Sequence, residues 1–228
     1  MTNSLNQQTY DLFRKDIMTF SLKPGESVSA AKIADRYHVS RTPAREALVK
    51  LETEGLVDIY PQSKSLISKI DTDRANEEWF IRKTLELGVV DGLFANVTEK
   101  DIKKMYDYCR KMEEISAAPR THDSAYEYLK SDDEFHALTF HIAGESLAAD
   151  ILASTMVHYN RIRLLIDLDD TYSRRTDNTH VQLVKHLERG EKEAYRELLT
   201  KHLGYHEQDT EDLREKYPGI FTDKKEEE

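Results

Sequence analysis

Four side chains of types that bind metal ions recur in the second half of the chain. Asp132 and His136 are four residues apart, so they lie on the same face of a helix. His180 continues an apolar stripe at helical spacing, and His202 lies one turn after a pair of leucines. Three imidazoles and one carboxylate on inward helix faces suit a divalent transition metal. We expect zinc, with nickel or another transition metal as the alternative.

Other interpretations of these residues remain open from spacing alone. A single histidine on an apolar face is more often a hydrogen-bonded core residue than a metal ligand. Asp133 also shares a helix face with His136, so geometry does not choose between Asp132 and Asp133. His206 follows His202 at a spacing of four but stands among acidic and amide side chains, and we expect it to be solvated.

A second chemical feature lies at residues 40–48, where two arginines are spaced four apart. Pro43 is tolerated in a first helical turn, and Ser40 or Thr42 can cap its start. The apolar residues that follow form one buried stripe, which leaves Arg41 and Arg45 exposed. A guanidinium can bind guanine O6 and N7 with two hydrogen bonds. The alternative is a pair of solvated helix charges.

The surrounding elements favour DNA recognition. Apolar spacing predicts helices over 5–20 and 30–37 before the arginine-bearing helix, and short strands over 57–60 and 66–70 after it. The turn between the strands carries Lys64, which can reach a phosphate. Three helices and a hairpin form a winged helix-turn-helix.

From residue 71 onward the pattern is helical throughout. We expect helices near 72–95, 99–116, 123–143, 145–167, 171–189 and 191–216. The predicted fold is therefore mainly α: a winged helix-turn-helix domain over 1–70 and an all-α antiparallel helical bundle over 71–228. A bundle of this size can enclose a small-molecule cavity.

Charge separates the two predicted domains. Residues 1–70 carry 10 basic and 8 acidic side chains, whereas the rest carries 23 and 35 of the 33 basic and 43 acidic residues in the chain. Because an acidic surface repels DNA, the first domain must be the part that meets it.

Cysteine content and hydropathy exclude several classes of protein. Cys109 is the only cysteine, so an intramolecular disulfide and a cysteine zinc cluster are both excluded. No apolar run approaches the roughly 20 residues that span a bilayer. The N-terminus has no signal-peptide pattern. We expect a cytoplasmic protein with no membrane partner.

Two groups of motifs resemble known families. The segments 22–25, 40–48 and 51–57 resemble the DNA-binding domain of GntR-type transcription regulators, although Ser63–Ser65 stands where that family usually has glycine at the wing tip. The segments 82–86 and 132–136, with the two later histidines, resemble the FCD domain of the FadR branch. The resemblance implies a helical ligand-sensing domain whose Asp and His residues hold a metal, repression as the usual activity and a small organic acid as the usual effector. It also favours Asp132 over Asp133 as the ligand.

The effector and partners follow as expectations. Arg82 or Arg161 can bind a carboxylate with two hydrogen bonds, and each has the alternative role of a structural ion pair. A homodimer on a palindromic operator in double-stranded DNA fits a single recognition helix per chain. We therefore expect a ligand-responsive transcription regulator. The alternatives are a sensor of the metal itself and a metal-dependent enzyme, the latter disfavoured because no separate general base or nucleophile accompanies the site.

Overall fold

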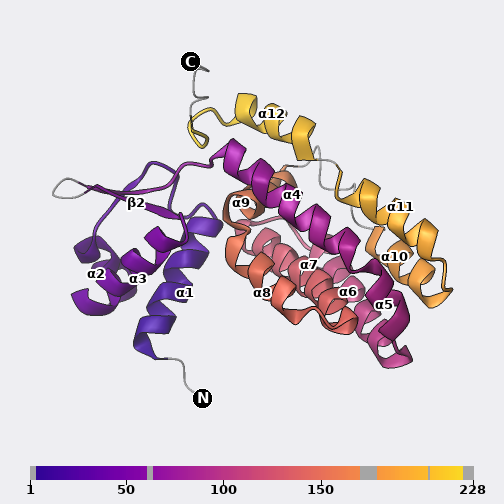
Figure 1. Ribbon diagram of the computed structural model, residues 1–228. Coiled ribbons are helices and arrows are strands. Elements are labelled where there is room, and N and C mark those ends of the chain that lie inside the picture. Colours follow the sequence, from indigo (N-terminus) through magenta and orange to yellow (C-terminus); the bar gives the residue numbers. More distant parts are fainter. Residues whose placement is uncertain (1–3, 61–63, 170–178, 205, 223–228) are drawn as a thin grey trace. The chain divides into compact units, whose positions relative to one another are not determined.

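The structure is a computed structural model that describes residues 4–60, 64–169, 179–204 and 206–222, with the side chains of 206–209 not described. The chain divides into two compact units, which we treat separately (Figure 1). Unit 1 contains residues 1–72 and 214–228, and unit 2 contains residues 73–213.

Unit 1 is a three-helix domain with a small sheet. Helices α1 (Leu5–Met18), α2 (Ala30–Tyr37) and α3 (Arg41–Thr53) precede or flank strands β1 (Ser27–Val28), β2 (Val57–Ile59) and β3 (Ser65–Ile67). The strands are antiparallel in the order β1-β3-β2, and Leu66 of β3 lies opposite both Ser27 and Asp58. The predicted winged helix-turn-helix is confirmed. The two-residue strand β1 was not predicted, because it is too short to show alternation.

The core of unit 1 explains its helices. Phe13 and Ile17 of α1 are fully buried, as are Ala44 and Leu51 of α3, and α3 packs against both α1 and α2. Gly55 follows α3 with a φ of 79°, a left-handed conformation that glycine adopts at no steric cost and that ends the helix.

The last part of the chain packs within unit 1. Ile70 donates its backbone N–H to Ile220 at 2.9 Å and accepts from the N–H of Thr222 at 2.9 Å. Phe221 is 2% exposed, and Arg214 donates to the Thr72 hydroxyl at 2.8 Å. The division expected from sequence, 1–70 and 71–228, differs from this grouping in where it places residues 214–228. Contacts between distant segments decide that assignment, and local sequence patterns do not report them.

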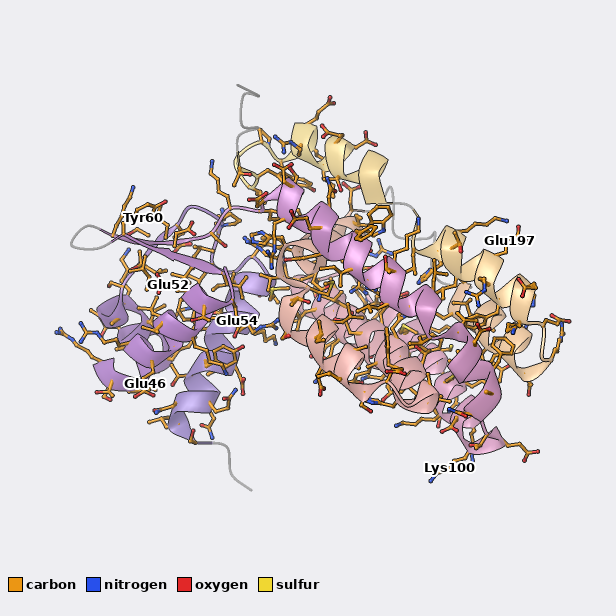
Figure 2. All side chains as sticks on the ribbon, viewed as in Figure 1. Glu46, Glu52, Glu54, Tyr60, Lys100 and Glu197 are labelled. Carbon is orange, nitrogen blue, oxygen red and sulfur yellow. The ribbon has the colours of Figure 1, made fainter. Side chains whose placement is uncertain are left out.

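Unit 2 is a helical bundle, as predicted. Its helices are α4 (Thr72–Gly88), α5 (Val90–Asn96), α6 (Glu99–Ala117), α7 (His122–Ala143), α8 (Ser146–Thr155), α9 (Val157–Leu168), α10 (Thr179–Glu188), α11 (Lys192–His202) and α12 (His206–Lys216), of which α4 begins in unit 1 and α12 ends there. Helix α7 is central and packs against α5, α6, α8 and α9 (Figure 1). Reciprocal capping boxes at Thr98 and Thr121 begin α6 and α7. Charged side chains such as Lys100 and Glu197 cover its surface (Figure 2).

Three segments predicted as single helices are each divided in two. Helix α4 ends before Val89, and α11 ends before Gly204. The break at Met156, where ψ is 58°, separates α8 from α9. There the buried Glu78 carboxylate accepts a hydrogen bond from the N–H of Tyr159 at 2.8 Å and so satisfies an amide of the first turn of α9. This capping group comes from a different helix, so local periodicity does not reveal it. The predicted helix start at 171 lies outside the described residues.

The bundle core contains Met105, Phe135, Leu183, Val184 and Leu199, all at most 3% exposed. Within the part of the chain that the structure describes, no helix is both long and apolar enough to cross a membrane.

Candidate functional site

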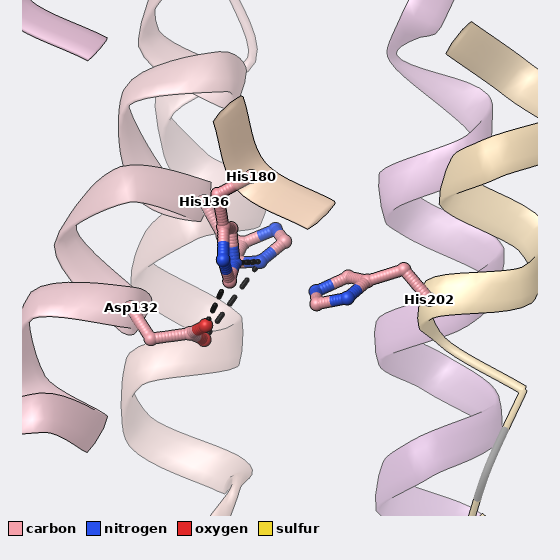
Figure 3. A group of neighbouring side chains, drawn as sticks. All are labelled: Asp132, His136, His180 and His202. Atoms are coloured by element: carbon pink, nitrogen blue, oxygen red, sulfur yellow. Dashed lines mark hydrogen bonds and ion pairs between the residues drawn. The ribbon is translucent and has the colours of Figure 1, made fainter. Parts of the chain in front are cut away.

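The four predicted metal ligands converge in the core of unit 2. Asp132 and His136 lie on α7, His180 on α10 and His202 at the end of α11 (Figure 3). One ligand-type atom from each lies within 4.8 Å of the others. Oδ1 of Asp132 is 2.9 Å from Nε2 of His180, and Nε2 of His180 is 3.3 Å from Nε2 of His136. The spacing of four on α7 brings its pair together, and the packing of α10 against α11 supplies the rest.

The three imidazole rings form a compact arrangement. The rings of His136 and His202 are parallel within 8°, with centroids 5.4 Å apart, and His180 meets His202 edge to face at 4.7 Å. Phe135 contacts the rings of His136 and His180 at 5.3 and 4.9 Å. These aromatic contacts restrict ring rotation and hold the nitrogens toward one another.

Burial and neighbouring charge set the ionisation of the group. Asp132 is 5% exposed; burial opposes its charge, but the Arg163 guanidinium and the neighbouring histidines lower the pKa of Asp132 well below its usual value. Burial, together with the other two histidines, lowers the pKa of His202 well below its usual value. A carboxylate is thereby kept ionised and an imidazole neutral, the forms in which each binds a metal.

A second layer of charged groups surrounds these four residues. Oε2 of Glu86 lies 2.7 Å from Nδ1 of His136, and Nε of Arg82 donates to Oε1 of Glu86 at 2.6 Å. Burial raises the pKa of Glu86, but the charges of His136 and Arg82 outweigh it and lower the pKa to about 2. Arg82 also donates to Oδ2 of Asp132 at 3.3 Å.

Helix α9 contributes a different arginine from the one expected. Arg163 makes a short ion pair with Oδ2 of Asp132 and donates to Oδ1 of Asp133 at 2.6 Å. Arg161 is fully buried two positions earlier, so the two side chains leave the helix about 200° apart. The structure thus brings Arg82 and Arg163 to the cluster, and the effector role expected for Arg161 stays a prediction.

The structure separates the two neighbouring aspartates. Asp132 belongs to the cluster, whereas the side chain of Asp133 is 43% exposed and contacts arginines and Asn160. A cavity of about 60 Å³ opens beside His136 between α4, α7 and α8. Its polar lining residues are Arg82, Glu86, Asp133, His136 and Asn160, and its apolar lining comes from α7 and α8 with Met156.

The predicted DNA-reading residues lie along one exposed face in unit 1. Arg41, Thr42 and Arg45 are exposed on α3, while Pro43 and Ala44 are buried. Ser40 occupies the N-cap position, but its side chain makes no capping hydrogen bond. It is exposed and free to contact a phosphate.

The wing and the recognition helix have further polar groups. Lys64 is exposed directly before β3, and its carbonyl accepts from the N–H of Tyr60 at 2.9 Å; the rest of the predicted turn, 61–63, lies outside the described residues. Glu46 also projects from α3 (Figure 2) and accepts from Asn6 at 2.5 Å. That contact joins α3 to the start of α1.

Comparison with known proteins agrees with both units. Residues 5–67 match the family described as bacterial regulatory proteins of the gntR family, and residues 79–205 match the FCD domain. The chain belongs to the GntR family of regulators and carries an FCD domain. GntR proteins bind DNA through the winged domain, so this protein is a DNA-binding transcription regulator.

Relatives and solved structures share this organisation. The HTH-type transcriptional repressor RspR of Escherichia coli K12 is 27% identical over 97% of this chain and 96% of its own length. The Nta operon transcriptional regulator of Aminobacter aminovorans is 25% identical over 90% of this chain and 94% of its own. The structure of E. coli McbR/YncC superposes with a TM-score of 0.73 at 18% identity, covering 95% of this chain and all of that one, which shows a shared GntR fold.

Sequence reasoning missed two groups at the centre. Glu86 was noted only as part of a motif, although its spacing of four from Arg82 predicts a buried ion pair on α4. Arg163 lies two positions after the expected Arg161 on α9, and only the rotation of that helix in the bundle selects it. In this GntR protein both residues contact a proposed metal ligand.

Proposed function

We propose that this GntR regulator releases its operator when a small organic acid binds at a divalent metal ion in unit 2. One observation supports the proposal above all. A buried carboxylate and three imidazoles converge within 4.8 Å, with two guanidinium groups next to them. Such a concentration of charge inside an apolar core is costly unless it serves binding.

The residues present fit a metal ion. Asp132, His136, His180 and His202 offer one oxygen and three nitrogens, the donor set of zinc and of other borderline divalent cations such as nickel. When bound, the ion supplies a positive charge that attracts an anion. His202 is held neutral, as a ligand must be, and Glu86 accepts the proton on the far nitrogen of His136.

An acid is the ligand class that the surroundings favour. Unit 2 is acidic overall, so an anion enters it only if local positive charge compensates. Arg82 and Arg163 provide that charge beside the proposed metal ligands, and each can form two parallel hydrogen bonds to a carboxylate. Neither arginine is more than 14% exposed.

Helix α3 carries most of the residues that we propose to contact DNA. Arg41, Thr42 and Arg45 read bases or phosphates in the major groove, while Ser40 and Lys64 contact the backbone. A homodimer presents two copies of α3 to the halves of a palindromic operator. Repression is the proposed activity because the E. coli relative is described as a repressor.

Coupling requires that the acid favour one arrangement of the two units over another. The chain connects the units twice, near Thr72 and near Leu213. We propose the first of these connections, over 71–74, as the hinge. A coupling free energy of about 1 to 3 kcal/mol changes operator affinity roughly 5- to 150-fold. By reciprocity, operator DNA weakens acid binding by the same factor.

The test begins with DNA sites selected from a random library by the purified protein and with its metal content. Organic acids are then screened by thermal shift, because a ligand of the folded state raises the melting temperature. The acid that binds should release the selected DNA from the wild type but not from a folded, metal-free His180→Ala variant. Equal release from both would defeat the proposed role of the metal. Release by metal alone would make the protein a metal sensor, and turnover of the acid would make it an enzyme.

A further inference from the structure

The half-exposed carboxylate of Asp133 lies against buried cationic and amide groups. Nη1 of Arg163 donates to Oδ1 of Asp133 at 2.6 Å, and Nδ2 of Asn160 donates to Oδ2 at 3.3 Å. Nη1 of Arg82 is 3.9 Å from Oδ1 of Asp133. Arg82 is 5% and Arg163 14% exposed, whereas Asp133 is 43% exposed. The cationic part of this group is therefore fixed in the bundle, and the anionic part faces solvent.

We propose that Arg82, Arg163 and Asn160 form a carboxylate-binding clamp, and that Asp133 occupies this clamp as an internal substitute for the effector acid. An incoming acid displaces Asp133, which turns toward solvent. The inference rests on the proposed function in taking the effector to be an acid, and it names the residues that receive its carboxylate and the residue that competes for them.

The energetics favour exchange of one anion for another. Removing Asp133 from the clamp costs little, because ion pairs with a solvent-exposed partner are worth at most about 1 kcal/mol. An anion that takes the place of Asp133 restores a second anionic partner for the Arg163 guanidinium, which otherwise keeps only Asp132. A neutral ligand of the same shape provides no negative charge for the guanidinium groups. The clamp therefore favours an anion over such a ligand.

Charge balance leads to the same conclusion. Two guanidinium groups face three carboxylates, those of Glu86, Asp132 and Asp133. If an acid joined them without displacing Asp133, a fourth carboxylate would crowd the same arginines. If the acid replaces Asp133, the number of carboxylates beside the two arginines stays at three.

The cavity beside the clamp limits the rest of the ligand. Its volume is about 60 Å³, less than half of the roughly 150 Å³ that accommodates benzene in an engineered protein cavity. Its polar walls come from Arg82, Glu86, Asp133, His136 and Asn160. The rest of its lining is apolar, formed by Phe140, Leu152 and Met156 with two alanines of α8 and one of α7. The geometry fits a monocarboxylate with a short apolar tail of a few carbons.

The experiment titrates propionate into the full-length protein by calorimetry, comparing wild type with Asp133→Asn. The amide keeps the shape of Asp133 but cannot compete as an anion, so propionate should bind the variant more tightly, by up to about fivefold, the factor by which a clamp occupied with about 1 kcal/mol reduces apparent affinity. Asp150→Asn removes the same charge from an exposed position on α8 and should bind propionate as the wild type does. Adding Arg163→Met to Asp133→Asn should abolish the gain.

Three results would overturn the proposal: equal propionate affinity in Asp133→Asn and wild type, no binding to either, or a gain that survives Arg163→Met. Repeating the titration on metal-free protein separates this test from that of the proposed function. A wild type that holds no metal, or whose DNA affinity ignores acids, defeats the proposed function. In either case the comparison of propionate affinities between wild type and Asp133→Asn still tests whether Asp133 competes for the clamp.

Discussion

Glu86 and His136 meet on the side of the imidazole ring that faces away from the other candidate ligands. Oε2 of Glu86 is 2.7 Å from Nδ1 of His136, while Nε2 of His136 points to His180. A carboxylate at Nδ1 holds the proton there, which leaves Nε2 with a free electron pair. The contact thus selects the tautomer of His136 that can bind a metal at the centre.

Replacing Glu86 by glutamine should therefore weaken metal binding. The amide keeps the size of the side chain but removes its charge, and loss of such a partner typically lowers metal affinity about 10- to 100-fold. Competition with a chromophoric chelator measures this for zinc or cobalt. Glu78→Gln is a matched control, because Glu78 is equally buried on the same helix but contacts Tyr159 and Arg74. If both variants lose metal affinity equally, destabilisation of the bundle is the cause.

The pH dependence of stability in metal-free protein should show two windows. The pKa of His202 is depressed in the folded state, so the unfolded chain takes up a proton first and stability falls as pH drops below about 6.5. The pKa of Glu86 is lowered to about 2, so its contribution is complete above about pH 4.5 and is lost toward pH 2.

Denaturant unfolding followed across pH checks both windows. In His202→Gln the decline in the free energy of unfolding between pH 6.5 and 5 should be reduced. In Glu86→Gln the difference from the wild type should stay constant above pH 5 and shrink below pH 4.5. A constant difference down to pH 2 would contradict the low pKa of Glu86.

Removal of the proposed metal should destabilise unit 2. A bound ion contributes folding free energy, so a chelator should lower the melting temperature of the wild type. The double variant His180→Ala with His202→Ala should lose most of its metal, as elemental analysis would show. His141→Ala changes an exposed histidine on α7 and should retain one ion per chain. Full metal content in the double variant would rule out this centre.

Arg45 should determine sequence preference in DNA binding. If Arg45 binds a base edge, Arg45→Ala should weaken the free energy of binding to the preferred DNA site by about 1 to 3 kcal/mol. It should also reduce the difference in affinity between the preferred site and other DNA sequences. Lys64→Ala should weaken all sequences about equally and reduce the salt dependence, because a phosphate contact carries no sequence information. DNA binding measured by fluorescence anisotropy at several salt concentrations distinguishes a base contact of Arg45 from a phosphate contact of Lys64. Wild-type specificity in Arg45→Ala would refute the assignment.

Some of these features were fixed by local sequence. The stripe of Ala44 and Leu51 determined which face of α3 is buried, and hence that Arg41 and Arg45 are exposed. The spacing of Asp132 and His136 placed both on one side of α7. Periodicity and turn residues report such properties because neighbours along one helix determine them.

Only the tertiary structure decided how distant helices meet. The packing of α6 against α7 and α10, and of α10 against α11, brings His180 and His202 to Asp132, and the rotation of α9 presents Arg163 to the same carboxylate. Glu78 caps the start of α9 from helix α4, and a bridge pairs Phe221 with Ile70. These contacts link residues far apart in sequence and depend on the burial of whole helix faces, which no local pattern encodes.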